Sequence, residues 1–470
     1  NTNPLLLKKT NNYNSVPFAS IKAEHFIPAL NKSILEAEKN ISNIENCVEE
    51  PSLSNVILPI ESAFDTVEYI VTVYYHYFAS IASDDIRKLV SEISSISTKL
   101  NNDVYLNEKL FKKIKYVYKN KESNNYNSDD LRLLDEIYSS FIRNGANLNQ
   151  VDKAKYRKLT EKLSQLSPKY SNNVLNATNK INEYWIDNED DLIGIPENAV
   201  ESAKLYAKSK MKEDLWCFTL DTNFGILLKS CKNRAIRAEV YKLYGSKCNG
   251  GEFDNSDNLK LISKLRHEKA NLLGYDTHAD YVLDRRMAKN KKNVYKLIDD
   301  LIKPSYKAAL DEYNNLKEYA LNKDNLKELE PWDLQYYSNL YKMEVYNFDE
   351  EVLRPYFQSE NVIQGVFEVA NKLYGLTFNE LQEVDKFHKD VKVYEVKDYN
   401  EEFIGLLYED IYPRSTKRGG AWMNQLRSQG MSSGEKEYPH VTFNCNLTKS
   451  TTSKPALLSL SEVRTIFHEF

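Results

Sequence analysis

The sequence predicts a mainly α-helical protein, and three observations support this fold class. Glycine (14 residues) and proline (13 residues) are scarce for a chain of 470 residues, and few turn-forming residues favour long helices over many short strands. Helical apolar periodicity runs through most of the first 185 residues. The breaks between the periodic stretches are short and polar, which favours helices that pack as antiparallel neighbours.

The N-terminal part is expected to form a helical bundle or stacked helical hairpins. No fixed-period repeat is visible, which argues against a solenoid. Helices are predicted, in order, over residues 20–47, 52–82, 86–120, 129–146 and 151–182.

The central part changes in character after residue 185. Pro331 can begin a helix, because the first helical position does not need a backbone N–H. The predicted elements are a loop over 186–196, a helix over 197–211, a strand over 214–221, and helices over 232–247, 257–273 and 291–322.

A small sheet is expected between residues 376 and 447, directly before a terminal helix. Strands are predicted over 391–398, 403–413 and 442–446. Ser459, followed three residues later by Glu462, matches a helix capping box. A sheet edge beside this helix could hold an extended peptide through main-chain hydrogen bonds.

The charge pattern argues against several classes of partner. Lys and Arg (63) nearly balance Asp and Glu (68), and the net charge of −5 is spread without large blocks of one sign. This balance disfavours a dedicated binder of nucleic acid or anionic membranes. The densest basic cluster, in residues 111–121, fits a solvated helix face. No apolar run approaches the ~20 residues of a bilayer span.

The cysteines favour a reducing compartment. They are widely spaced and form no C-x-x-C pair, although a pairing of Cys231 with Cys248 stays open. No signal-peptide pattern is visible, so a cytoplasmic location is expected. A periplasmic one stays open, because no initiator methionine fixes the start. The cysteines are Cys47, Cys217, Cys231, Cys248 and Cys445.

His468 and Glu469 begin a possible H-E-x-x-H zinc motif. Two histidines four residues apart share one helical face and can bind one metal, with the glutamate as base. The sequence ends at Phe470, before the second histidine, so this signal alone is weak. His267 is also followed by glutamate, but Asn271 stands where the second histidine would be. No phosphate-loop, dinucleotide-binding or nucleophile-elbow motif occurs.

Two other features allow a structural and a functional interpretation. RGGAWM, residues 418–423, is either a hairpin turn with a core tryptophan or a strand whose bare backbone lets a substrate chain approach. His440 is either a surface histidine at a strand start, which we favour, or a substrate-site group.

Segments along the whole chain carry a family resemblance. In this order and at these spacings they resemble the thimet-oligopeptidase and peptidyl-dipeptidase family of zinc metallopeptidases. Within it, bacterial peptidyl-dipeptidases (dipeptidyl carboxypeptidases) look most similar, followed by oligopeptidase A. The segments are NPLL, AEHFIPAL, NDVYLNEKLF, DKAKYRKLTEKLSQLS, LRHEKANLLGY, EPWDLQYYS, FDEEVLRPYF, DIYPRSTKRGGAWM and FNCNLTKSTTSKPALLSLSEVRTIFHEF.

The resemblance implies a mostly helical ellipsoid whose deep channel admits short unstructured peptides. Residues 1–227 would form an N-terminal helical domain, and residues 228–470 the first part of the catalytic domain. The implied cofactor is one Zn²⁺, with His468 as a ligand and Glu469 as the general base. Zinc lowers the pKa of a bound water to about 7, and a nearby carboxylate can take its proton. Gly420 and Ala421 become candidates to pair with the substrate backbone, and His440 a candidate substrate contact.

The chain departs from the family pattern at its end. The second histidine and the downstream glutamate ligand lie beyond Phe470, and so do the family's later tyrosine and histidine substrate contacts. A catalytic zinc site normally has three protein ligands, so the 470 residues alone are expected to be inactive. Apolar faces left exposed should promote association, although full-length family members are expected to be monomeric.

Three functional hypotheses follow. The expected activity of the complete enzyme is release of C-terminal dipeptides from short peptides. The alternative within the family is an oligopeptidase A-like metalloendopeptidase. The alternative of another class is a truncated, non-catalytic helical protein that binds peptides or a partner.

Overall fold

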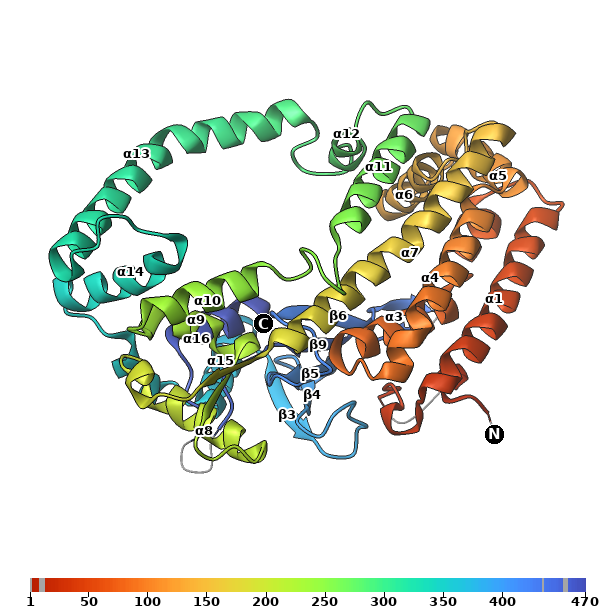
Figure 1. Ribbon diagram of the computed structural model, residues 1–470. Coiled ribbons are helices and arrows are strands. Elements are labelled where there is room, and N and C mark those ends of the chain that lie inside the picture. The colour runs from red at the N-terminus through yellow and green to blue at the C-terminus, as the bar shows by residue number, and fades with distance from the viewer. Residues whose placement is uncertain (1, 8–12, 433–434, 451–454) are drawn as a thin grey trace.

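The computed structural model describes residues 2–7, 13–432, 435–450 and 455–470. Within them the protein is mainly α-helical, with sixteen α-helices and a small mixed sheet, as the sequence predicts (Figure 1). Among the described helices, none combines the length and apolar character that a membrane span requires.

The N-terminal helices largely follow the predicted periodicity. Two predicted helices, over 52–82 and 86–120, are each divided in the structure. The second division lies at Asn107, whose side chain accepts a hydrogen bond from the Leu110 N–H and so starts a new helix. The helices are α1 (Ala23–Asn46), α2 (Leu58–Ser62), α3 (Asp65–Ser80), α4 (Asp84–Tyr105), α5 (Glu108–Lys119), α6 (Ser128–Arg143) and α7 (Gln150–Ile181).

The central part contains a two-stranded antiparallel sheet and a series of helices. The strands are β1 (Glu183–Ile186) and β2 (Trp216–Thr219). The strand predicted over 214–221 therefore ends early, because a helix begins at Leu220. The helices are α8 (Glu197–Ser209), α9 (Leu220–Ser230), α10 (Arg234–Gly245), α11 (Ser256–Leu272), α12 (His278–Leu283), α13 (Lys291–Asp324), α14 (Pro331–Val345) and α15 (Ser359–Tyr374).

The main sheet has five strands in the order β3-β4-β5-β9-β6. Strands β5 and β9 run parallel, the other pairs are antiparallel, and β6 is an edge strand. A short hairpin precedes β9, and α16 (Leu460–Glu469) ends the chain. The strands are β3 (Thr377–Leu381), β4 (Lys392–Lys397), β5 (Phe403–Asp410), β6 (Trp422–Arg427), β7 (Gly430–Ser432), β8 (Glu435–Glu437) and β9 (His440–Asn444).

Strand β5, in the middle of the main sheet, is buried on both faces. On β5, Leu406 and Tyr408 belong to the core formed with the N-terminal helices, whereas Leu407 belongs to a second core formed with α15 and α16. This alternation is the two-residue period of a strand. One continuous core thus joins residues from both parts of the chain, and the division at residues 227 and 228 stays a prediction.

Candidate functional site

The terminal helix α16 begins at the predicted capping box. The Ser459 hydroxyl accepts a hydrogen bond from the Glu462 N–H (3.3 Å), and the Glu462 carboxylate accepts one from the Ser459 N–H (2.8 Å). Ile466 is fully buried in the second core. The cap and this contact fix the helix that carries the metal-motif residues against the sheet.

His468 and Glu469 lie at the end of α16, next to the end of β9. His468 is exposed and Glu469 is half-buried. Burial raises the pKa of the Cys445 thiol, which follows β9, to about 12, and the Glu469 charge adds to that shift. The Phe470 ring lies 5.8 Å from that of Phe367.

The described residues do not complete a zinc site. No group of three His, Cys, Asp or Glu side chains among them lies close enough to hold a metal ion. A catalytic zinc normally takes three protein ligands. His468 is thus a single donor, and the residues present do not fit the whole cofactor site.

The two glycines of RGGAWM lie directly before the edge strand β6. This segment connects β5 to β6, which are separated in the sheet by β9, so the hairpin interpretation is wrong. Trp422 is buried, as the structural interpretation predicts. Gly420 has φ +93°, a conformation that favours glycine. The Asn446 side-chain amide donates to the carbonyls of Arg418 (3.0 Å) and Gly420 (2.6 Å).

A buried carboxylate anchors the segment that leads to these glycines. Asp410 is fully buried and accepts two hydrogen bonds from the Arg414 guanidinium, at 2.8 and 2.7 Å. The Lys417 ammonium lies 3.1 Å from the same carboxylate. Burial lowers the pKa of Lys417 to about 8, although the Asp410 charge opposes that shift. The main chain also reaches α3, where the Arg418 N–H donates to the Ala79 carbonyl (2.8 Å).

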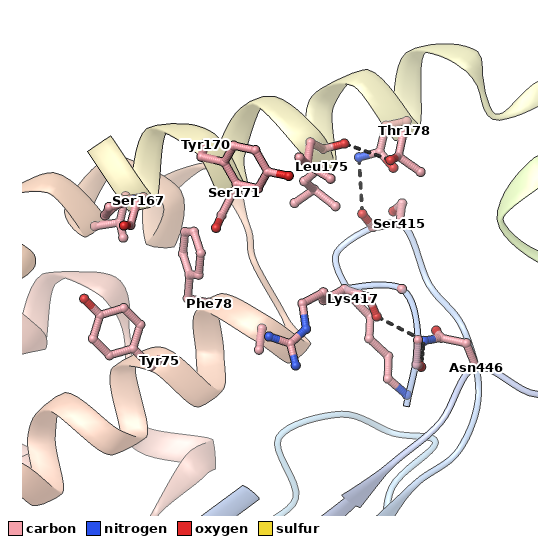
Figure 2. A pocket seen from close by; sticks show the side chains of 18 of the residues that line it. Tyr75, Phe78, Ser167, Tyr170, Ser171, Leu175, Thr178, Ser415, Lys417 and Asn446 are labelled. Carbon is pink, nitrogen blue, oxygen red and sulfur yellow. Dashed lines mark hydrogen bonds between the residues drawn. The ribbon is translucent and has the colours of Figure 1, made fainter. Parts of the chain in front are cut away.

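A cavity of about 870 Å³ lies between the N-terminal helices and this segment. Figure 2 shows Tyr75 and Phe78 from α3 and a row of side chains from α7 on one side, with Ser415, Lys417 and Asn446 on the other. Gly419, Gly420 and Asn424 of β6 also line it. Hydroxyl groups recur along the α7 wall at the spacing of one helical face: Ser164, Ser167, Ser171 and Thr178.

His440 lies at the start of β9, opposite Leu406 and Arg427. It is 1% exposed, so the interpretation as a surface histidine is wrong. Burial lowers the pKa of its imidazole to about 3, which keeps the ring neutral at physiological pH. It does not line the cavity described above.

The structure brings Gly420 to the cavity, whereas Ala421, His440, His468 and Glu469 are not among its lining residues. The site roles of all five stay predictions. Sequence reasoning missed the Asp410–Arg414–Lys417 anchor and the hydroxyl face of α7. The spacing of serines and threonines along residues 164–178 was a signal that could have identified the second.

The known proteins that this chain resembles are peptidases. The model of peptidase family M3 matches residues 227–470. Oligopeptidase A of Salmonella typhimurium is 32% identical over 476 residues, covering 100% of this chain and 69% of the relative. Oligopeptidase A of Escherichia coli gives the same identity and coverage. Dipeptidyl carboxypeptidase of Escherichia coli is 29% identical, again over 100% of this chain and 69% of the relative.

Proposed function

This chain belongs to peptidase family M3, and from that membership we propose that it binds short unstructured peptides in the cavity beside Gly419 and Gly420. The observation that carries the proposal is the position of an edge strand at the cavity. Among the strands that the structure describes, β6 is paired only with β9, and Asn424 of β6 lines the cavity together with both glycines.

An edge strand offers unpaired main-chain groups to a further extended segment. A peptide in the cavity could therefore add to the sheet along β6. Gly420 supports this arrangement, because no atom lies within 4 Å of the place where a Cβ would be. The peptide backbone could thus approach the chain closely there. Ala421, which follows, is a further candidate for main-chain pairing, whereas buried His440 would act only indirectly.

For the chemistry, we propose that His468 is a zinc ligand and Glu469 the general base of the complete enzyme. When it is bound, zinc acts as a Lewis acid and lowers the pKa of a water molecule that it coordinates. Because the described residues lack a three-donor group, the 470 residues alone should bind peptides without cleaving them. In any polypeptide that contains these residues and cleaves peptides, Glu469→Gln should lower kcat by about 10²–10⁴-fold and leave the zinc content unchanged.

The proposed specificity is release of C-terminal dipeptides. Oligopeptidase A-like endopeptidase activity is the second candidate, which the identity of 32% to oligopeptidase A favours over the 29% to dipeptidyl carboxypeptidase. Mass spectrometry of the products distinguishes the two. Amidation of the substrate C-terminus should abolish cleavage by a peptidyl-dipeptidase and leave endopeptidase cleavage intact.

A third candidate is a protein that only binds peptides or a partner. The lack of a three-donor group among the described residues favours it for this chain. Stoichiometric Zn²⁺ binding together with peptide turnover by the 470-residue chain would exclude it.

We also propose that the protein is cytoplasmic and that the full-length enzyme is monomeric. All five cysteines are free, including Cys231 and Cys248, and free thiols are typical of a reducing compartment.

The experiment that tests peptide binding is isothermal titration calorimetry of the 470-residue chain with a heptapeptide. Ser171 lines the cavity from α7, whereas Lys169 on the same helix does not and is exposed. Ser171→Trp should narrow the cavity and weaken binding at least about tenfold, whereas Lys169→Trp should leave the Kd unchanged. Equal binding by both variants would contradict the proposed cavity.

A further inference from the structure

The cavity lining is unbalanced in charge. Its cationic residues are Lys247, Arg414, Lys417 and Arg418, and no aspartate or glutamate lines it in the described part of the chain. A concave site lined by one sign of charge concentrates ligands of the opposite sign. The imbalance is notable because the whole chain carries a net charge of −5.

Two of the four cations are already paired inside the protein. Arg414 makes two charge-assisted hydrogen bonds with Asp410 and a third, of 2.9 Å, with the Ser80 carbonyl. The Lys417 ammonium is fully buried and donates to the Asp410 carbonyl (2.7 Å) as well as facing its carboxylate. These groups hold the segment in place: the Lys417 ammonium donates to three carbonyls, and the Arg414 guanidinium is held by Asp410 and Ser80.

Arg418 and Lys247 have no carboxylate partner among the described residues. The Arg418 guanidinium lies over the Trp422 ring, with its central carbon 4.5 Å from the ring centroid. Desolvation alone lowers the pKa of Arg418, with no carboxylate opposing the shift. The Lys247 ammonium lies 3.5 Å from the centroid of the Tyr244 ring. Aromatic faces hold a cation in position and leave its N–H donors available.

The position of Arg418 is fixed by its own main chain. Its N–H donates to Ala79 of α3, and its carbonyl accepts from Asn446. Gly419 and Gly420 follow it directly, before β6 begins at Trp422. A peptide paired along β6 would therefore pass Arg418 at the end of that strand.

We propose that this cavity selects peptides that carry a carboxylate, which pairs with Arg418 or Lys247, the two lining cations without a carboxylate partner among the described residues. The inference rests on the proposed peptide-binding function and names its substrate class. A guanidinium can bind a carboxylate through two parallel hydrogen bonds, which an ammonium cannot. The carboxylate could be an Asp or Glu side chain or the peptide's free C-terminus, and the two sources are separable by experiment.

The test is calorimetry of the 470-residue chain with four N-acetylated alanine-rich heptapeptides. They combine a central Glu or Gln with a free or an amidated C-terminus. The peptide with Gln and an amidated end should bind, and a carboxylate at the recognised position should lower the Kd about tenfold at low salt. The preference should shrink at 0.5 M NaCl, because the cavity is open to solvent.

Variants assign the preference to the two cations. Arg418→Gln and Lys247→Gln should each reduce the preference, measured as the ratio of the Kd of the uncharged peptide to the Kd of the carboxylate-bearing peptide, at least about threefold. Arg418→Lys should retain part of it, which separates charge from packing on Trp422. Lys292→Gln is the matched control, because Lys292 is an exposed cation outside the cavity.

Each outcome decides between the two proposals. If all four peptides bind equally, the carboxylate inference is overturned while peptide binding stands. If the preference persists in both glutamine variants, the carboxylate is bound elsewhere and the inference is also overturned. If no peptide binds, the proposed function fails and the inference fails with it. A preference that depends on the central Glu assigns the side chain, and one that depends on the free end assigns the terminus.

Discussion

At the residue scale, the Asp410 carboxylate organises the approach to the cavity. It is fully buried, pairs with both Arg414 and Lys417, and lies at the end of β5. Two buried cations depend on one anion, so its charge cannot be removed without leaving both uncompensated. Breaking a buried pair in this way costs more free energy than the pair contributes over an apolar alternative.

Asp410→Asn should therefore destabilise the protein by about 3–5 kcal/mol. Urea denaturation followed by circular dichroism measures the free energy of unfolding. The control is Lys296→Gln, which removes an exposed ion pair with Asp300 on α13 and should cost no more than about 0.5 kcal/mol. Equal effects of the two substitutions would contradict the role of Asp410.

A second buried carboxylate predicts a pH dependence. Glu409 is 4% exposed and accepts a hydrogen bond from the Tyr394 hydroxyl (3.0 Å). Burial raises the pKa of Glu409 from its ordinary 4.5 to about 7. Between these values the folded state binds more protons than the unfolded state, so this group's contribution to stability falls as pH rises from 4.5 to 7.

Glu409→Gln keeps the acceptor for Tyr394 and removes the charge. The variant should gain stability relative to the parent chain as pH rises from 5 to 8, by about 1–3 kcal/mol. Urea denaturation of both proteins at the two pH values measures this difference. A difference that stays constant, or that shrinks toward pH 8, would show that Glu409 titrates normally.

At the element scale, the two glycines before β6 have different requirements. Gly420 has φ +93°, whereas Gly419 has no positive φ, and at neither does any atom lie within 4 Å of the place that a Cβ would take. Space is therefore equal at the two sites and only the backbone conformation differs. This makes Gly419 a direct control for Gly420.

Gly420→Ala should destabilise the protein by about 1–2 kcal/mol, because an L-residue resists this conformation. Gly419→Ala should be neutral or slightly stabilising, since alanine restricts the unfolded chain. The difference between their unfolding free energies is the quantity to measure. Similar values for both would mean that the loop relaxes freely and does not hold Gly420 in place.

The same scale shows where sequence reasoning succeeds and where it stops. The capping box at Ser459 and the helix start at Pro331 are local signals, and both helices begin there. The break at Asn107 was missed because apolar periodicity continues across it, although Asn followed by helix formers is a capping pattern. Helix α9 was missed because it begins directly after the strand Trp216–Thr219 with no turn residue between them, and Leu220 continues the apolar pattern of the strand.

The cavity itself could not be predicted from local pattern. Its walls come from residues as far apart as Tyr75 and Asn446, and only packing of α3, α4 and α7 against the sheet brings them together. Gly419 and Gly420 were recognisable because two adjacent glycines before a strand are a pattern visible in the sequence itself. Arg418 and Lys247 could not be recognised as candidate carboxylate-binding residues from the sequence. That interpretation depends on the absence of carboxylates from the described cavity wall, which is a property of the folded structure.

At the scale of the whole molecule, α13 carries a large exposed apolar stripe. Figure 1 shows α13 as a long helix along the outer edge of the view. Its C-terminal part packs against α14 around Ala320. An exposed apolar face of this kind is what the sequence analysis expects to promote association. The rest of α13 exposes large apolar side chains at the spacing of one helical face: Tyr295, Ile298, Ile302, Tyr306, Leu310 and Tyr313.

The chain should therefore associate at micromolar concentrations, and Ile302→Lys with Tyr306→Lys should shift it toward monomer. Sedimentation velocity measures the shift over a concentration series. Asp311→Lys is the control, because it makes the same change in net charge on the opposite face of α13. If the control reduces association equally, charge repulsion and not the stripe is responsible.

The central claim is that a peptide occupies the cavity and pairs with β6, and hydrogen–deuterium exchange tests it most directly. Exchange of the 470-residue chain is followed by mass spectrometry with and without a saturating Glu-containing heptapeptide. The account predicts slower exchange over residues 417–427 and over the cavity face of α7, and unchanged exchange in α1. Protection confined to α13, or no protection anywhere despite binding, would contradict it.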